Sequence, residues 1–171
     1  MIFRLLMIGC LLWLNISAYG QSASPPTKTT LAVSAMLNEA TGNAAFERNK
    51  ANALAFYDLM FNQSKPAEAM RLYAGANYKQ HNPEVADGKD AFIAFFDKMA
   101  KEYPGKRIEF KRVFADGNFV ILHSLHRFPG WTGGEWAAID IFRCDGDGKL
   151  VEHWDVLQKI PATAAHGNGM F

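Results

Sequence analysis

The chain has 171 residues, 18 of them basic and 17 acidic, and almost half are hydrophobic. This length suits one ordinary domain with a buried core and a single ligand pocket. The net charge is close to zero and the sequence has no cluster of basic residues. Both features argue against nucleic acid or an anionic membrane surface as the partner.

The N-terminus is typical of a secretory signal peptide. Arg4 precedes an apolar stretch, and Ala18 and Gly20 provide the small side chains that a signal peptidase requires. The stretch is interrupted at Asn15 and falls short of the roughly 20 apolar residues of a membrane anchor. We therefore expect residues 1–20 to be cleaved and the mature protein to be periplasmic or secreted, without a stable membrane span.

The remaining chain would hold one cysteine, Cys144, and so could form no internal disulfide. Residues 21–46, which open with a segment rich in Ser, Thr and Pro, are predicted to form a flexible lead-in. Residues 47–161 would form the folded domain, and residues 162–171 a short C-terminal tail.

Three helices are predicted at the start of this domain. Apolar residues recur at helical spacing in residues 47–62 and 88–103, and Pro66 suits the first turn of a helix over residues 66–73. A short extended piece at residues 77–81 lies between the second helix and the third.

The pattern then changes to strands at residues 107–114 and 119–128, followed by a hairpin around the Asp-Gly-Asp-Gly turn at residues 145–148. Helices followed by an antiparallel meander predict an α+β fold. The same turn resembles a calcium loop, but the later acidic ligand is missing, so we interpret it as a hairpin turn.

The hairpin places ionisable side chains in an apolar setting. A two- or four-residue loop would put Asp140 opposite His153, whereas a three-residue loop would pair Asp140 with Glu152 or Trp154. In the first register one face would contain Trp136, Ala138, Asp140, Phe142, Val151, His153, Asp155 and Leu157. That face would be an apolar wall with groups that can exchange protons, and Trp154 would lie on the outer face.

Three segments resemble the SnoaL-like, polyketide-cyclase-like family of the nuclear transport factor 2 superfamily. They are Tyr-Lys-Gln-His-Asn-Pro at 78–83 with Ala-Asp-Gly at 86–88, Val-Phe-Ala-Asp-Gly-Asn at 113–118, and Asp-Ile-Phe-Arg at 140–143 with Glu-His-Trp-Asp at 152–155. The resemblance implies a cone, in which a curved antiparallel sheet wraps around three N-terminal helices and holds one pocket, and it implies a homodimer. Family members include aldol-type cyclases, isomerases, dehydratases, epoxide hydrolases and proteins that only bind, so the fold leaves the activity open.

The resemblance also suggests catalytic residues. In the polyketide cyclases an Asp on the strand that matches Asp140 is the acid/base, and His126 is the best match to a nearby His. The apolar neighbours of Asp140 predict burial, which would raise its pKa. The alternative is an aspartate that faces solvent or pairs with Arg143 or Arg127.

Further ligand contacts are predicted on the same wall. His153 and Asp155 are two apart and share a face, although His153 could equally be a structural, buried histidine. Trp136 and Phe142 are candidate substrate contacts, and the resemblance places His81 at the pocket rim. His123 and His126 point to opposite faces of one strand, so a zinc site is poorly supported, and we expect neither metal nor cofactor.

These features favour an exported, cofactor-independent enzyme that performs aldol cyclisation, isomerisation or dehydration on a small apolar carbonyl compound. Asp140 would move the proton, His126 or His153 would donate to the enolate oxygen, and His81 would position the substrate. The alternative is a non-catalytic module that binds a small hydrophobic molecule or serves only for dimerisation.

Overall fold

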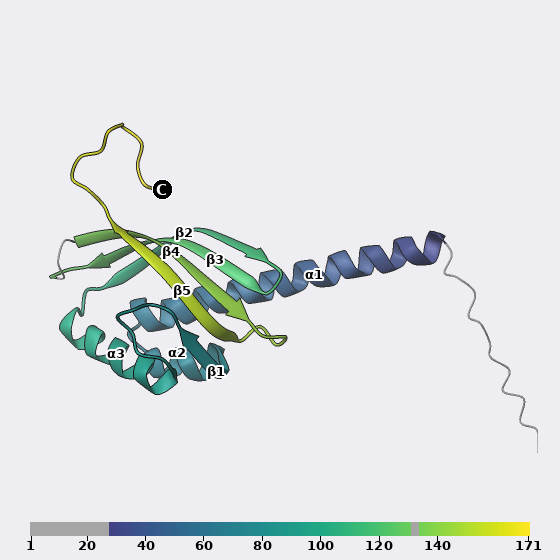
Figure 1. Ribbon diagram of the computed structural model, residues 1–171, viewed down its shortest axis with the longest axis horizontal. Helices are drawn as coiled ribbons and strands as arrows, with labels where there is room; N and C mark the ends of the chain where they lie inside the picture. The colour runs from purple at the N-terminus through teal and green to yellow at the C-terminus, as the bar shows by residue number, and fades with distance from the viewer. Residues whose placement is uncertain (1–27, 131–133) are drawn as a thin grey trace, which may run out of the picture.

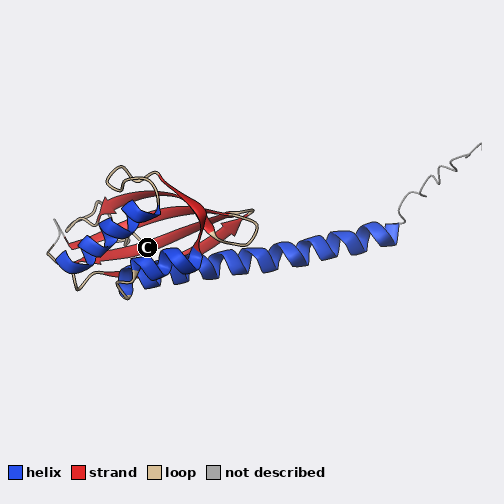
Figure 2. Ribbon diagram, turned by 90° about the horizontal axis from the view of Figure 1, so that it is seen from below, coloured by secondary structure: helices blue, strands red, loops and turns tan. Residues whose placement is uncertain are grey.

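Residues 28–130 and 134–171 are described by a computed structural model, and the predicted signal peptide lies outside them. In this part of the chain, helices pack against one face of a five-stranded sheet (Figures 1 and 2). The helices are α1 (Lys28–Tyr57), which continues into a π-helical turn (Asp58–Asn62), α2 (Pro66–Tyr73) and α3 (Lys89–Glu102). The strands are β1 (Ala74–Gln80), β2 (Arg107–Asp116), β3 (Phe119–Phe128), β4 (Gly134–Cys144) and β5 (Leu150–Lys159). The predicted α+β class is confirmed.

Helix α1 starts far earlier than predicted. It begins at Lys28, so the flexible lead-in is wrong for residues 28–46, and both views show this part of α1 extending beyond the sheet (Figures 1 and 2). The segment is rich in Ala, a strong helix former, and it prolongs a helix that is packed at its other end, which removes the cost of nucleation. Most of its described side chains are exposed, so it has no buried face for periodicity to reveal.

The strands follow the order β1-β5-β4-β3-β2 in a curved sheet that does not close. Neighbouring strands are antiparallel except β1 and β5, which run parallel. The predicted meander is therefore confirmed for β2 to β5, while the edge strand β1 departs from it. A tight hairpin can join only antiparallel strands. Because β1 and β5 are far apart in the sequence and no such turn joins them, they can pair in parallel.

The core lies between the helices and the inner face of the sheet. Phe56 of α1, Phe92 of α3 and Phe142 of β4 are almost completely buried, with the Phe56 ring 5.7 Å from that of Phe92 and 5.9 Å from that of Phe142. This aromatic packing holds the end of α1 against β4 and so fixes the distance between the residues that both elements carry.

The β4–β5 hairpin has a register two residues away from the predicted one. Asp140 lies opposite Asp155, and His153 lies opposite Phe142. Because side chains alternate with a period of two, this shift leaves Asp140, His153 and Asp155 on the same face. A bulge next to Cys144 changes the pattern near the turn, where Leu150 takes the core position predicted for Val151.

The C-terminal tail lies near the outer face of the sheet. The Phe171 ring is 5.2 Å from the His123 ring, and Lys111 Nζ is 5.3 Å from the Phe171 ring centroid. The tail therefore makes contacts away from the inner face.

Within residues 28–130 and 134–171, no helix combines the length and the apolar character needed to cross a bilayer.

Candidate functional site

A cavity of about 520 Å³ lies between the inner face of the sheet, helix α3 and the end of α1. Its apolar lining consists of Tyr57, Phe61, Pro83, Val85, Phe92, Phe95, Phe96, Met99, Phe128, Trp136 and Leu157. Its polar lining consists of Gln80, Asn82, Glu84, His126, His153 and Asp155. Cavities of this size and character hold small, largely apolar molecules that carry a few polar groups.

Asp140, on β4, is completely buried and does not line this cavity. Its Oδ1 accepts a hydrogen bond from the Tyr57 hydroxyl at 2.8 Å, and its Oδ2 accepts one from the Ser124 hydroxyl at 3.1 Å. His153 Nε2 is 3.5 Å from Oδ1, and His126 Nε2 is 3.8 Å from Oδ2. Each carboxylate oxygen thus has one hydroxyl in contact and one imidazole close by.

The pKa of Asp140 moves opposite to the direction that we predicted from its apolar neighbours. Burial alone would raise this pKa, but the interactions of the carboxylate with the His126 and His153 side chains outweigh burial and hold the pKa well below its ordinary value. The sequence pattern reveals burial but not these partners. Burial, reinforced by the charge of Asp140, raises the pKa of Tyr57, so the Tyr57 hydroxyl keeps its proton.

Ser124 connects Asp140 to His126 on β3. Its Oγ is 3.0 Å from His126 Nε2. A hydroxyl has one proton, and an ionised carboxylate can only accept, so Ser124 donates to Asp140 and His126 Nε2 donates to Ser124. His126 Nδ1 has no hydrogen-bond partner among the described residues. Neutral His126 therefore carries a lone pair on this unpartnered nitrogen, in a side chain that lines the cavity.

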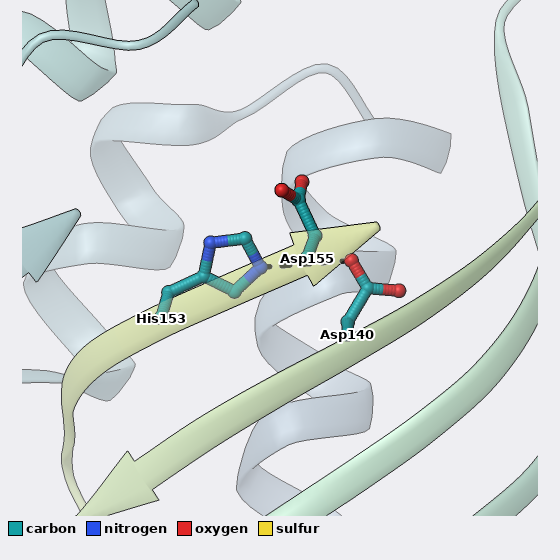
Figure 3. A group of neighbouring side chains, drawn as sticks. All are labelled: Asp140, His153 and Asp155. Carbon is teal, nitrogen blue, oxygen red and sulfur yellow. Dashed lines mark ion pairs between the residues drawn. The ribbon is translucent and has the colours of Figure 1, made fainter. Parts of the chain in front are cut away.

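His153 is held on both sides of its ring. It projects from β5 toward Asp140 on β4 (Figure 3). Its Nδ1 is 2.9 Å from Gln80 Oε1, and its Nε2 is 2.8 Å from the Tyr57 hydroxyl oxygen. The His153 ring is thereby fixed by α1 and by the end of β1, which come from distant parts of the sequence.

Asp155 completes a group with metal-like spacing. Asp140, His153 and Asp155 each offer one ligand atom within 4.8 Å of the others, and Figure 3 shows their side chains together. Asn82 Nδ2 donates to both carboxylate oxygens of Asp155, at 2.9 and 2.8 Å. The ligand atoms of this group already have hydrogen-bond partners within the protein, and our expectation of no metal remains a prediction.

The structure gathers most of the predicted site residues on one face. His126, His153, Asp155 and Trp136 line the cavity, and His126 rather than His123 faces inward, as the resemblance implied. Phe142 does not line the cavity; it is fully buried, with its ring 4.9 Å from that of Tyr57. Phe142 therefore packs against Tyr57 from within the core and does not contact the cavity.

His81 also does not line the cavity. Gln80 pairs with His153 across the β1–β5 ladder and faces inward, so the next residue, His81, points to the outer face. There the His81 ring stacks on Trp154 at 4.7 Å, and its Nε2 is 2.8 Å from Glu152 Oε1. Trp154 thus lies on the outer face, as predicted, and Gln80 occupies the position expected for His81.

Four site residues escaped the sequence-based prediction: Tyr57, Ser124, Gln80 and Asn82. Ser124 could have been found, because it shares a strand face with His126 two residues away. Tyr57 lies 83 positions from Asp140 and sits among core aromatics at helical spacing, so no local pattern connects the two.

The chain belongs to the SnoaL-like domain family, whose sequence profile matches residues 53–153. The match begins in α1 and ends in β5, so it includes Tyr57, Ser124, His126, Asp140 and His153. The chain shows no significant sequence similarity to any curated protein.

Solved structures share the fold at low sequence identity. A candidate polyketide cyclase from Bacillus cereus ATCC 10987 superimposes with a TM-score of 0.56 and 19% identity, over 64% of this chain and 74% of that one. An LEH-like epoxide hydrolase from M. tuberculosis gives a TM-score of 0.56 and 16% identity, over 66% and 84%. An NTF2-like protein of unknown function from Cytophaga hutchinsonii ATCC 33406 gives 0.52 and 15%, over 64% and 89%. These likenesses establish the NTF2-like fold and leave the chemistry to the site.

Proposed function

We propose that the protein is an exported, cofactor-independent acid/base enzyme that moves a proton next to the carbonyl group of a small, largely apolar compound. The observation that carries this proposal is the state of His126 at the cavity wall. Its Nε2 is fixed by Ser124 and, through Ser124, by Asp140, while its Nδ1 lacks a partner among the described residues. A buried nitrogen left unpaired is costly, and a ligand in the cavity would complete it.

In this mechanism His126 Nδ1 takes a proton from the carbon next to the carbonyl. The electron pair of the broken C–H bond forms an enolate, and His126 becomes an imidazolium that Ser124 and Asp140 stabilise. Returning the proton to another atom of the enolate gives isomerisation. Passing it to a departing hydroxyl group gives water and hence dehydration, and attack of the enolate carbon on a second carbonyl, whose oxygen then takes the proton, gives aldol cyclisation.

Gln80 is the neutral donor best placed for the enolate oxygen. Its Oε1 accepts from the backbone N–H groups of His81 and Asn82 and also contacts His153 Nδ1. The Gln80 side chain lines the cavity, and its amide nitrogen is therefore the atom that can donate to a ligand.

Asp140 acts in this proposal as a positioning residue and not as the base that the sequence suggested. It is fully buried and does not line the cavity, so it has no direct route to a substrate carbon. Its negative charge fixes the direction of the Ser124 hydroxyl and hence the tautomer of His126. This role needs the low pKa that its partners provide.

The charges of the lining favour an uncharged substrate. Asp155 and Glu84 line the cavity, and its described lining contains neither Lys nor Arg. A carboxylate or phosphate group on a ligand would therefore meet the negative charge of Asp155 and Glu84 without a Lys or Arg partner. Neutral ketones and aldehydes fit this electrostatic setting better than keto acids do.

The proposal predicts exchange of the hydrogens next to a carbonyl. Neutral aryl ketones and the matching keto acids are incubated with the protein in D₂O, and loss of the α-hydrogen signal is followed by ¹H NMR. We expect catalysed exchange with neutral ketones, and a loss of about 10²- to 10⁴-fold in His126→Gln, which removes the base. His123→Gln, on the same strand but outside the cavity lining, is the matched control and should keep the activity.

Equal exchange rates in His126→Gln and His123→Gln would contradict the role of His126. Binding of the ketones without exchange, seen as a change in Trp136 fluorescence, would instead support the non-catalytic binding module.

A further inference from the structure

The hydrogen bonds around His153 require more protons than its neighbours supply in their ordinary charge states. Gln80 Oε1 accepts from the backbone N–H of His81 and of Asn82, both at 2.9 Å, which identifies this atom as the oxygen of the amide. It can therefore only accept. The proton in its 2.9 Å contact with His153 Nδ1 must belong to His153.

The Tyr57 hydroxyl oxygen has two further close contacts. It lies 2.8 Å from Asp140 Oδ1 and 2.8 Å from His153 Nε2, and each contact of this length needs one proton between its atoms. Ionised Asp140 supplies none, Tyr57 supplies one, and neutral His153 has spent its single proton on Gln80. Only two protons would then be available for three contacts. In one of the two contacts of the Tyr57 oxygen, two lone pairs would face each other without a proton between them.

We propose that His153 is a doubly protonated imidazolium in the resting protein and is joined to the Asp140 carboxylate through the Tyr57 hydroxyl. His153 Nδ1 then donates to Gln80, His153 Nε2 donates to the Tyr57 oxygen, and the Tyr57 hydroxyl donates to Asp140. Every contact receives one proton. Tyr57 is a positioning residue that keeps the two charges in a fixed geometry.

The surrounding charges support this assignment. Asp140 and Asp155 lie directly opposite each other on β4 and β5, an arrangement of like charges that is unfavourable by itself. A positive His153 lies close to both, with one ligand atom of each residue within 4.8 Å of the others. The titratable groups that face His153 are thus Tyr57 of α1, Asp140 of β4 and Asp155 of β5, and Gln80 of β1 is neutral.

The protonation of His153 can be read directly in the free protein. The full chain is labelled with ¹⁵N in histidine, and two-bond ¹H–¹⁵N spectra at pH 7 distinguish imidazolium from each neutral tautomer; His153→Gln assigns the signals. We expect the imidazolium pattern for His153 and the neutral Nε2–H pattern for His126. In Tyr57→Phe, which removes the bridge, His153 should change to the neutral Nδ1–H pattern.

Tyr78→Phe is the matched control, because it removes a buried hydroxyl that has no hydrogen-bond partner among the described residues. The His153 pattern should be unchanged in this variant. If Tyr57→Phe does not fold, the wild-type spectrum alone decides the protonation state.

A neutral His153 in the wild type would overturn the proposal, as would an imidazolium that persists in folded Tyr57→Phe. Stoichiometric Mg²⁺ or Zn²⁺ that shifts the His153 signals, with the shift lost in Asp155→Asn, would also overturn it by making a metal ion the missing cation. These readouts need no substrate, so they fail or succeed independently of the exchange assay for His126.

Discussion

Asp140 is a buried carboxylate whose charge organises the polar side chains around it. Asn in its place would keep the shape but remove the charge that the hydroxyls and imidazoles face. We expect Asp140→Asn to lower the free energy of unfolding at pH 7 by about 3 kcal/mol, the cost of breaking a buried, hydrogen-bonded charge arrangement. Urea denaturation measures this, with the exposed Asp116→Asn as control, which should stay within about 0.5 kcal/mol of the wild type.

The same pair of proteins gives a pH test. Because the pKa of Asp140 is lower in the folded protein than in the unfolded chain, its ionised form contributes stability above the unfolded pKa of about 3.9. This contribution is lost as the pH falls below that value. The stability difference between wild type and Asp140→Asn should therefore shrink as the pH falls below about 4. A difference that grows in acid would show that the pKa of Asp140 is raised.

The site was partly predictable from individual residues. Strand alternation was enough to place His153 and Asp155 on one face, and the family resemblance selected His126 over His123. The direction of the Asp140 pKa could not be predicted, because it depends on side chains from β3 and β5 whose distances no linear pattern contains. Tyr57 was hidden for the same reason, since a buried tyrosine on an apolar helix face looks like core.

The β4–β5 turn depends on a glycine that touches α1. Gly148 has φ of +79°, and a Cβ there would lie 2.6 Å from Arg48 Nε and 2.9 Å from Asn49 Oδ1. Asn52 also donates to the Gly148 carbonyl at 2.8 Å. We expect Gly148→Ala to destabilise the protein by about 2 kcal/mol through backbone strain and crowding.

Gly146→Ala is the control for this turn. Gly146 has no positive φ, and a Cβ there would meet no atom within 4 Å. Thermal unfolding followed by circular dichroism compares the two variants with the wild type. Equal melting temperatures for the two variants would contradict a structural role for the contact between the turn and α1.

The bounds of several helices and strands were easier to predict than the register in which the strands pair. Helix α2 and strand β3 have the predicted bounds, because Pro66 and the turn residues mark them chemically. The hairpin register was wrong by two. Cys144 pairs with Leu150 instead of Lys149, which shifts the register by one, and the bulge at Val151 adds the second residue; only cross-strand contacts reveal either. The start of α1 was missed because an exposed helix needs no apolar stripe.

At the scale of the whole molecule, export remains a prediction about residues 1–20. Expression of the full chain in a bacterium should yield a mature protein that begins near Gln21, measured by intact mass and N-terminal sequencing. Ala18→Arg should block cleavage, because the signal peptidase needs a small side chain there. Ala35→Arg, an exposed position in α1, should be processed normally. An uncleaved wild type would contradict the prediction.

The extended helix α1 changes how a homodimer has to be detected. At 1.5 Å per residue its 30 residues form a rod about 45 Å long, part of which extends beyond the sheet. Such a shape increases the hydrodynamic radius, so a monomer would leave a gel-filtration column early and imitate a dimer. Sedimentation equilibrium or light scattering, which report mass independently of shape, are therefore the measurements that can count the subunits.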